Sequence, residues 1–137
     1  MRRPPSGRPP GLSWILVADA DQVAARRLAA CVLRRGLPAY ATARGTDALR
    51  AVTARCFVLA VIDVALEDMA GYELAARLRA HDPRLPVVMT TTDRGPETER
   101  LARQAGIVHY AMKPLAGRRI ETIVAKRLGA PMSAGPR

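Results

Sequence analysis

The chain is poor in aromatic residues, in cysteine and in long hydrophobic runs. Aromatic side chains make up 4% of its 137 residues, which disfavours an aromatic-rich β-sandwich. The two cysteines, Cys31 and Cys56, fall within predicted secondary structure, where lone cysteines usually serve as small buried hydrophobes. No run approaches the roughly 18 apolar residues that a membrane span needs, and no apolar signal segment follows the N-terminal charges. These absences predict a cytoplasmic protein without a disulfide, a cysteine-bound metal or a membrane contact.

Lysine and acidic residues are also scarce. The chain has 22 basic residues against 12 acidic ones, a net charge of +10, yet only Lys113 and Lys126 are lysines. The arginines are spread over every predicted helix and the N-terminal segment without interleaved aromatic residues, so the charge alone specifies no nucleic-acid partner. A compact ammonium differs chemically from a fork-shaped guanidinium. At position 113 the chain therefore has a lysine, although almost all of its other basic residues are arginines.

What the sequence does contain is a strict alternation of strand and helix patterns. Apolar runs predict strands at 14–18, 38–42, 57–62, 86–90 and 108–112, and helical spacing predicts helices over 22–35, 45–55, 71–80, 96–105 and 117–128. Such alternation predicts the α/β class, a doubly wound five-stranded parallel sheet between two layers of helices. We expect one domain over residues 13–128, between flexible tails at 1–12 and 129–137 that are rich in Pro and Gly.

Polar residues stand where four of the predicted strands end. These residues are Asp19, Asp63, Thr91 and Lys113. Because the carboxyl ends of parallel strands open into one crevice, we expect the four side chains to converge. Taken singly, each has a structural interpretation, such as strand-end packing for Thr91 or helix capping for the nearby Asp21. Together, two carboxylates, a hydroxyl and an ammonium form a set suited to phosphoryl chemistry.

These residues, in this order and at these spacings, resemble the receiver domain of bacterial two-component response regulators. The resemblance covers residues 14–128. It rests on the acidic turn after the first strand, on Asp63, on Gly71 eight positions later, on Thr91, and on Ala105-Gly106 leading to Tyr110 and Lys113-Pro114. It implies a flavodoxin-like fold with sheet order 2-1-3-4-5 and a site at the switch point between strands one and three.

The resemblance implies a role for each residue of the site. Asp63 would be the nucleophile that takes a phosphoryl group from the phosphohistidine of a histidine kinase or phosphotransfer protein, giving an aspartyl phosphate. Lys113 would neutralise charge on the phosphoryl group, and Thr91 would donate its hydroxyl to it. Tyr110 would act with Thr91 as the switch that carries the signal to the face built by the fourth helix, the fifth strand and the fifth helix.

The same resemblance implies a Mg²⁺ site made by Asp19, Asp63 and the backbone carbonyl of Ala65. The acidic turn departs from the family, which usually has two adjacent acids, because Ala20 replaces the second acid and removes an oxygen ligand. Three interpretations stay open: Asp21 could serve as a substitute, Asp19 could bind the ion directly, or the site could bind metal poorly. We favour a weakened but working site because the rest of the set is intact.

The loop after the phosphoacceptor departs from the family as well. Glu67 replaces the proline that the family usually has four residues after its phosphoacceptor, which predicts a looser loop. Glu67 and Asp68 also place two acids near the site. We expect both to be solvated loop carboxylates rather than ligands of the ion.

An enzyme alternative comes from the acidic turn. The apolar run before Asp19, followed by Asp-x-Asp-x-Val, looks like the first motif of haloacid-dehalogenase-type phosphatases, in which Asp19 would be the nucleophile and Asp21 the acid/base group. The order of the other motifs argues against this alternative. That family places its metal-binding acids after its Thr and Lys motifs, whereas Asp63 precedes both Thr91 and Lys113.

The sequence therefore predicts a single-domain response regulator, a signalling phosphoacceptor that catalyses only its own phosphorylation and dephosphorylation. Only nine residues follow Leu128, so we expect no attached DNA-binding domain. Output would pass through an unidentified partner protein, from a monomer or weak dimer. The alternative, raised by Ala20, is a receiver-like domain that no longer uses phosphate and acts as a protein-binding module.

Overall fold

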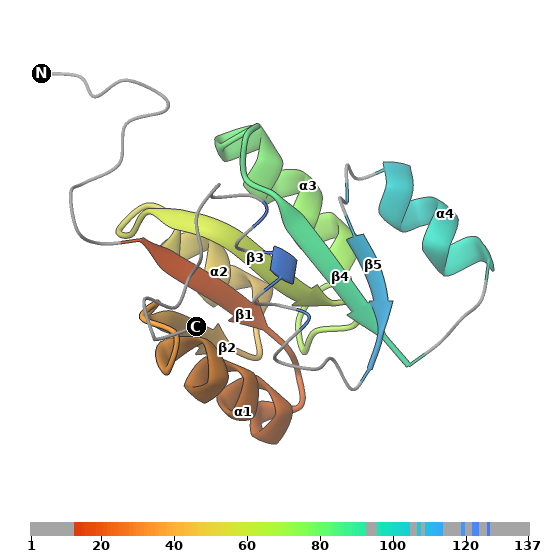
Figure 1. Cartoon of the computed structure of the whole chain (residues 1–137). Coiled ribbons are helices and arrows are strands. Elements are labelled where there is room, and N and C mark those ends of the chain that lie inside the picture. The colour runs from red at the N-terminus through yellow and green to blue at the C-terminus, as the bar shows by residue number, and fades with distance from the viewer. Residues whose placement is uncertain are drawn as a thin grey trace, which may run out of the picture.

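The computed structural model contains one five-stranded parallel sheet with helices on both faces (Figure 1). It describes residues 13–92, 96–104, 107, 109–113, 119, 122–123 and 126. The strands are β1 (Trp14–Ala18), β2 (Ala39–Thr42), β3 (Phe57–Asp63), β4 (Val87–Thr91) and β5 (His109–Met112), and the helices are α1 (Gln22–Leu33), α2 (Gly45–Ala51), α3 (Gly71–His81) and α4 (Pro96–Gln104). The expected tails and most of the helix predicted over 117–128 lie outside the described residues.

The order of the strands confirms the predicted topology. The sheet reads β2-β1-β3-β4-β5, and every neighbouring pair is parallel. The chain moves outward from β1 to β2 and then returns to the other side of β1 with β3. This reversal makes the carboxyl ends of β1 and β3 the switch point, where open α/β sheets bind their ligands.

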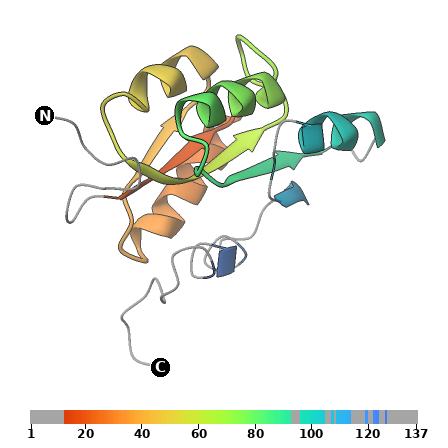
Figure 2. The same ribbon diagram turned by 90° about the horizontal axis from the view of Figure 1, so that it is seen from above.

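The central strands bury both of their faces, which explains why their sequences are almost continuously apolar. Successive side chains of a strand point to opposite faces. Leu16 and Ala18 of β1 therefore pack with α2 and α3, whereas Ile15 and Val17 pack with α1. Figure 2 shows the sheet between α2 and α3 on one side and α1 on the other.

Two helices end earlier than their sequences predict. α1 ends at Leu33 and is followed by a turn to Gly36, whose φ of +96° is the left-handed conformation that favours glycine. α2 ends at Ala51, and the hydroxyl of Thr53 donates to the carbonyl of Arg50 at 2.8 Å, which occupies one of the last helical carbonyls. For the elements whose bounds lie within the described residues, the other predicted boundaries differ from the observed ones by at most one residue. None of the helices within the described ranges is long and apolar enough to cross a membrane.

One arginine makes cation–π contacts with two rings at the amino-terminal end of the sheet. The guanidinium of Arg55, in the turn after α2, lies 4.7 Å from the ring centroid of Trp14 and 5.0 Å from that of Tyr40. Trp14 begins β1, Tyr40 lies in β2, and both rings pack against the core formed with α2 and α3. The stack therefore joins the turn after α2 to two strands, at the end of the sheet away from the polar site.

Candidate functional site

Four of the predicted site residues lie at the carboxyl ends of neighbouring strands. Asp63 is the last residue of β3 and Thr91 the last of β4, whereas Asp19 directly follows β1 and Lys113 directly follows β5. The amide of Lys113 donates to the carbonyl of Thr91 at 2.8 Å, which fixes the end of β5 against the end of β4. The fold thus brings together side chains that are as many as 94 positions apart.

The ammonium group of Lys113 is shared between two carboxylates. Its Nζ lies 2.9 Å from Oδ2 of Asp19 and 3.1 Å from Oδ2 of Asp63. The side chains are largely buried, with 16% of Lys113, 9% of Asp19 and 13% of Asp63 exposed, so water weakens these contacts less than it weakens a surface ion pair. Two carboxylates and one ammonium leave a net negative charge, which favours the binding of a further cation.

The pKa values of the cluster follow from this sharing. Burial alone would lower the pKa of the Lys113 ammonium, but its hydrogen bonds to Asp19 and Asp63 outweigh burial and raise that pKa. Burial raises the pKa of the Asp19 carboxyl; bonds from Lys113 and from the Asp21 amide oppose this, and the neighbouring Asp63 adds to it. Lys113 therefore stays charged, and burial makes the ionised form of Asp19 less favourable than it would be in water.

The arrangement along the chain matches one known family. Residues 15–125 match the response regulator receiver domain. This chain belongs to that family. Receiver domains are signalling modules and generally not enzymes, and their family implies histidine kinases or phosphotransfer proteins as partners. The alternative of a haloacid-dehalogenase-type phosphatase finds no support in this match.

Two relatives of known name are longer proteins than this chain. The chain is 30% identical over 121 residues to the transcriptional regulatory protein ZraR of Salmonella typhimurium, an alignment of 88% of this receiver and 27% of ZraR. It is 34% identical over 109 residues to the transcriptional regulatory protein TcrA of Mycobacterium tuberculosis, covering 79% of this chain and 42% of TcrA. The receiver thus spans between a quarter and a half of these two relatives.

Solved receiver structures share the fold. A CheY-like receiver domain protein from Methanospirillum hungatei superimposes with a TM-score of 0.78 at 24% identity, covering 86% of this chain and 98% of that one. A putative response regulator from Chloroflexus aurantiacus gives a TM-score of 0.76 at 25% identity, with the same coverage of both chains. At such identities these likenesses establish the flavodoxin-like architecture of the receiver.

The acidic cluster of this receiver has the ligands that Mg²⁺ prefers, and receiver domains generally bind this ion. Mg²⁺ is usually held by one or two carboxylates and keeps several waters, and Asp19 and Asp63 provide two carboxylates around one shared cation. In the described part of the chain, no three His, Cys, Asp or Glu side chains group into a metal cluster. The set therefore fits Mg²⁺ with few protein ligands. Ala65, whose backbone carbonyl is the predicted third ligand, lies next to Asp63, because its amide donates to Oδ1 of Asp63 at 3.4 Å.

The acidic turn uses its two remaining acids differently. Asp21 is the N-cap of α1, where its Oδ1 accepts hydrogen bonds from the amides of Val23 at 3.1 Å and Ala24 at 3.2 Å. This confirms the capping interpretation of this residue. Asp19 instead turns toward Lys113 and the site. Of the three interpretations of the missing acid, this geometry favours Asp19 as the direct ligand over Asp21 as a substitute.

The two switch candidates lie on adjacent strands. Thr91 is fully buried at the end of β4. Tyr110 is half-buried in β5, opposite Met89 of β4, and packs against the core formed with α2 and α3. The structure thus places Thr91 at the site edge and Tyr110 beside the strand that carries it, and their switching role stays a prediction.

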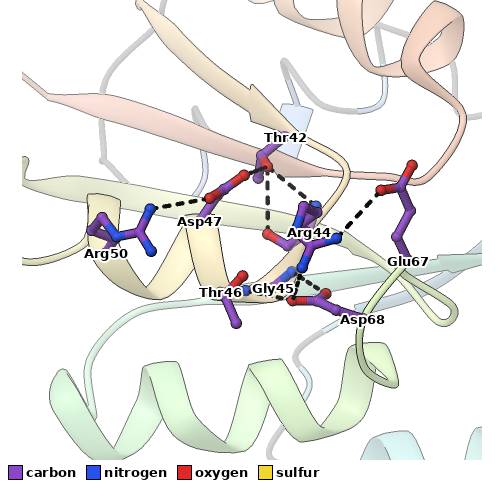
Figure 3. Close-up of polar contacts among 8 residues, drawn as sticks. All are labelled: Thr42, Arg44, Gly45, Thr46, Asp47, Arg50, Glu67 and Asp68. Carbon is purple, nitrogen blue, oxygen red and sulfur yellow. Dashed lines mark hydrogen bonds and ion pairs between the residues drawn. The ribbon is translucent and has the colours of Figure 1, made fainter.

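The β3–α3 loop, residues 64–70, makes a contact with the start of α2 that the sequence did not reveal. Asp68 was expected to be a solvated carboxylate, and this is wrong, because only 13% of its side chain is exposed. Its Oδ1 accepts from the Gly45 amide at 2.7 Å and its Oδ2 from the Thr46 amide at 3.0 Å (Figure 3). Loss of hydration would raise its pKa, but these backbone hydrogen bonds outweigh that effect and lower the pKa to about 2. Glu67, by contrast, is half-exposed, as expected.

One signal in the sequence could have exposed this contact. The N-cap position of α2 is occupied by Arg44, whose side chain makes no cap hydrogen bond. A helix start without its own side-chain acceptor leaves amide groups that another residue must satisfy. The acids of the neighbouring loop were the nearest candidates along the sheet edge.

Gly71 closes the other end of the same loop. Its amide donates to the carbonyl of Val64 at 2.7 Å. A Cβ atom at this position would collide with the backbone carbonyl of Asp63. The glycine eight residues after the phosphoacceptor candidate is therefore required by the close approach of α3 to the end of β3.

Proposed function

We propose that Asp63 accepts a phosphoryl group from the phosphohistidine of a histidine kinase or a phosphotransfer protein. The observation that carries this proposal is the Lys113 ammonium, bound to both Asp63 and Asp19 at the switch point of the sheet. Phosphoryl transfer to a carboxylate needs an acceptor, a fixed positive charge and a site for a metal ion, and Asp63, Lys113 and Asp19 are suited to these roles.

The chain's own residues perform the transfer mainly by position and charge. A carboxylate oxygen of Asp63 forms the new O–P bond while the N–P bond of phosphohistidine breaks, and the electron pair of that bond goes to the imidazole nitrogen. Lys113 neutralises charge on the phosphoryl oxygens, and the Thr91 hydroxyl donates a hydrogen bond to one of them. A bound Mg²⁺ supplies additional charge neutralisation, for which Asp19 and Asp63 would be the carboxylate ligands.

The phosphorylated receiver would signal by shifting a two-state equilibrium. A Thr91 hydroxyl engaged by the phosphoryl group favours the inward position of Tyr110 on the neighbouring strand. The face that responds is formed by α4 and β5, together with the predicted helix 117–128. Output by this receiver alone through a partner protein, and a monomeric or weakly dimeric state, stay predictions of the sequence.

A second function is favoured by one specific observation. Ala20 is exposed and offers no ligand, while Asp21 is engaged as a helix cap. A receiver with two carboxylates in its acidic site could bind Mg²⁺ too weakly to be phosphorylated and act as a constitutive protein-binding module.

Intact-protein mass after incubation with acetyl phosphate and MgCl₂ tests both functions. We expect the unchanged protein to gain one phosphoryl group and Asp63→Asn to gain none. Gain by Ala20→Asp alone would overturn phosphorylation of the natural chain and favour the binding module. If neither the unchanged protein nor Ala20→Asp gained a phosphoryl group, the assignment of the site itself would be overturned.

A further inference from the structure

The β3–α3 loop is bound to the start of α2 by more than the cap at Asp68. The amide of Glu67 donates to the carbonyl of Ala43 at 3.1 Å, which adds a main-chain link between the two segments. The guanidinium of Arg44 lies 3.8 Å from the Glu67 carboxylate and 3.9 Å from that of Asp68 (Figure 3). Met69 packs so closely on Gly45 that a Cβ atom there would collide with its side chain. The tip of the loop, residues 67–69, thus contacts the start of α2 through a main-chain hydrogen bond, ion pairs and side-chain packing.

The opposite side of the loop contacts the phosphoacceptor candidate. The amide of Ala65 donates to Oδ1 of Asp63 at 3.4 Å, and the amide of Leu66 donates to the carbonyl of Met69 at 3.1 Å. Ala65 therefore lies between the acidic site and the bound tip. Any motion of the tip relative to α2 would move the backbone of Ala65 relative to the Asp63 carboxylate.

The carboxylate of Asp68 is the strongest single link in this arrangement. It makes two charge-assisted hydrogen bonds to main-chain amides and is mostly shielded from water. The remaining links are one neutral hydrogen bond, the packing of the partly buried Met69 on Gly45, and ion pairs of the half-exposed Arg44, which contribute little. Removing the carboxylate should therefore release the loop tip.

We propose that Asp68 is a positioning residue of the phosphoacceptor site: by binding the loop to α2 it holds the Ala65 carbonyl where a Mg²⁺ ion next to Asp63 can use it. This inference rests on the proposed function. A ligand that is fixed before the ion arrives loses less conformational entropy on binding, and groups that orient metal ligands typically change metal affinity by about tenfold or more when removed.

A plain helix cap is the competing explanation, and a double variant separates the two. Asp68→Ala removes both the cap of α2 and the anchor of the loop. Adding Arg44→Asn gives α2 a capping side chain of its own, because position 44 has the extended backbone of an N-cap residue. This second change restores the helix start without restoring the link to the loop. Arg44→Asn alone and Glu73→Ala, which removes an exposed carboxylate of α3, are the matched controls.

Three readouts are measured on each variant. Amide hydrogen exchange of Leu66 and Glu67 reports the loop itself and requires neither ion nor phosphoryl group. Amide chemical shifts during titration with MgCl₂ give the affinity for the ion, and intact mass after acetyl phosphate gives the rate of phosphorylation. We expect the double variant to recover the stability lost in Asp68→Ala, yet to exchange both amides faster and to bind Mg²⁺ about tenfold more weakly than the unchanged protein.

Full recovery of amide protection and Mg²⁺ affinity in the double variant would overturn the positioning role and leave Asp68 as a cap. The positioning role would also be overturned if Glu73→Ala weakened Mg²⁺ binding as much as Asp68→Ala, since charge alone would then explain the loss. A natural chain that is never phosphorylated would overturn the proposed function. In that case the exchange of Leu66 and Glu67 still decides whether Asp68 fixes the loop.

Discussion

Two carboxylates of one acidic turn differ in how folding affects them. Asp19 is buried beside Asp63, and its pKa is raised because folding removes water from its charge. Asp21 is exposed and stabilises α1 by accepting hydrogen bonds from the first amides of the helix. Ionisation of Asp19 therefore does not stabilise the fold, which agrees with its predicted role as a ligand at the site.

Replacing Asp19 with Asn should raise the free energy of unfolding at pH 7 in the absence of divalent cations, because it removes a charge that folding buries. Since a raised pKa means that the folded state binds the proton more readily, this gain should shrink as the pH falls and Asp19 becomes protonated. Urea unfolding followed by circular dichroism measures both effects.

Asp21→Asn is the matched control for that experiment. Asn and Asp cap helices about equally well, so we expect its stability to stay within about 0.5 kcal/mol of the unchanged protein. A net loss of stability in Asp19→Asn would contradict the argument, and would mean that the ion pair with Lys113 outweighs the burial of the carboxylate.

At the scale of elements, the junction of β3 and α3 depends on a glycine for space. Gly71→Ala should lower the free energy of unfolding by at least about 2 kcal/mol, because its methyl group would overlap the backbone carbonyl of Asp63. We also expect slower phosphorylation, since the displaced carbonyl belongs to the phosphoacceptor candidate. Chemical unfolding and acetyl phosphate labelling measure the two effects.

Gly36→Ala provides the comparison. Its site has open space around the missing Cβ atom and a φ of +96°, so only backbone strain opposes the change, at about 1 kcal/mol. The labelling rate should not change, because Gly36 lies in the turn after α1. Equal effects of the two glycine substitutions on labelling would rule out a local role of Gly71.

The cation–π contacts of Arg55 should stabilise the end of the sheet opposite the site. Arg55→Met keeps the aliphatic stem and removes the charge that faces the rings of Trp14 and Tyr40, and we expect a loss of about 1 kcal/mol. Arg50→Met is the control, because the Arg50 side chain is 78% exposed and pairs with Asp47 at the surface. Circular dichroism during urea unfolding compares them, and equal stabilities would contradict a role for the stack.

Most elements could be predicted because their determinants are local. The apolar runs of β1 and β3 and the alternation of strands with helices are visible in a single sequence, and the resemblance to receivers supplied the sheet order. The end of α2 could not be predicted, because the pattern continues to Arg55 while the helix stops at Ala51. The following turn makes contacts that helical periodicity does not reveal, among them the Thr53 hydroxyl on the carbonyl of Arg50 and Arg55 on the ring of Trp14.

The site was predictable in part for the same reason. Asp63 is the last residue of its strand, and Asp19 and Lys113 directly follow theirs, so the sheet alone brings the three residues together. The role of Asp68 depends on the amides of Gly45 and Thr46, which are 23 and 22 positions away. These residues begin α2, and no sequence pattern links that helix to the loop. Such contacts follow from tertiary packing and leave only indirect traces in a sequence.

At the scale of the whole molecule, acid should weaken the fold through Asp68. Its pKa is lowered from 3.8 to about 2 in the folded protein, so its contribution is fully present above about pH 4 and is lost as the pH falls toward 2. Unfolding midpoints of the unchanged protein and of Asp68→Ala, measured from pH 7 to pH 2, should differ most at pH 5 to 7 and converge near pH 2. A difference that does not change with pH would contradict the ionised cap.

The position of Trp14 has a consequence for spectroscopy. It is the only tryptophan in the sequence, and the five residues of β1 separate it from Asp19 by about 16 Å. Its emission should therefore follow global unfolding without responding directly to an ion at the acidic site. A rise in the fluorescence-monitored unfolding midpoint with added MgCl₂ would then measure stabilisation by ligand binding alone, and its dependence on concentration would give the dissociation constant.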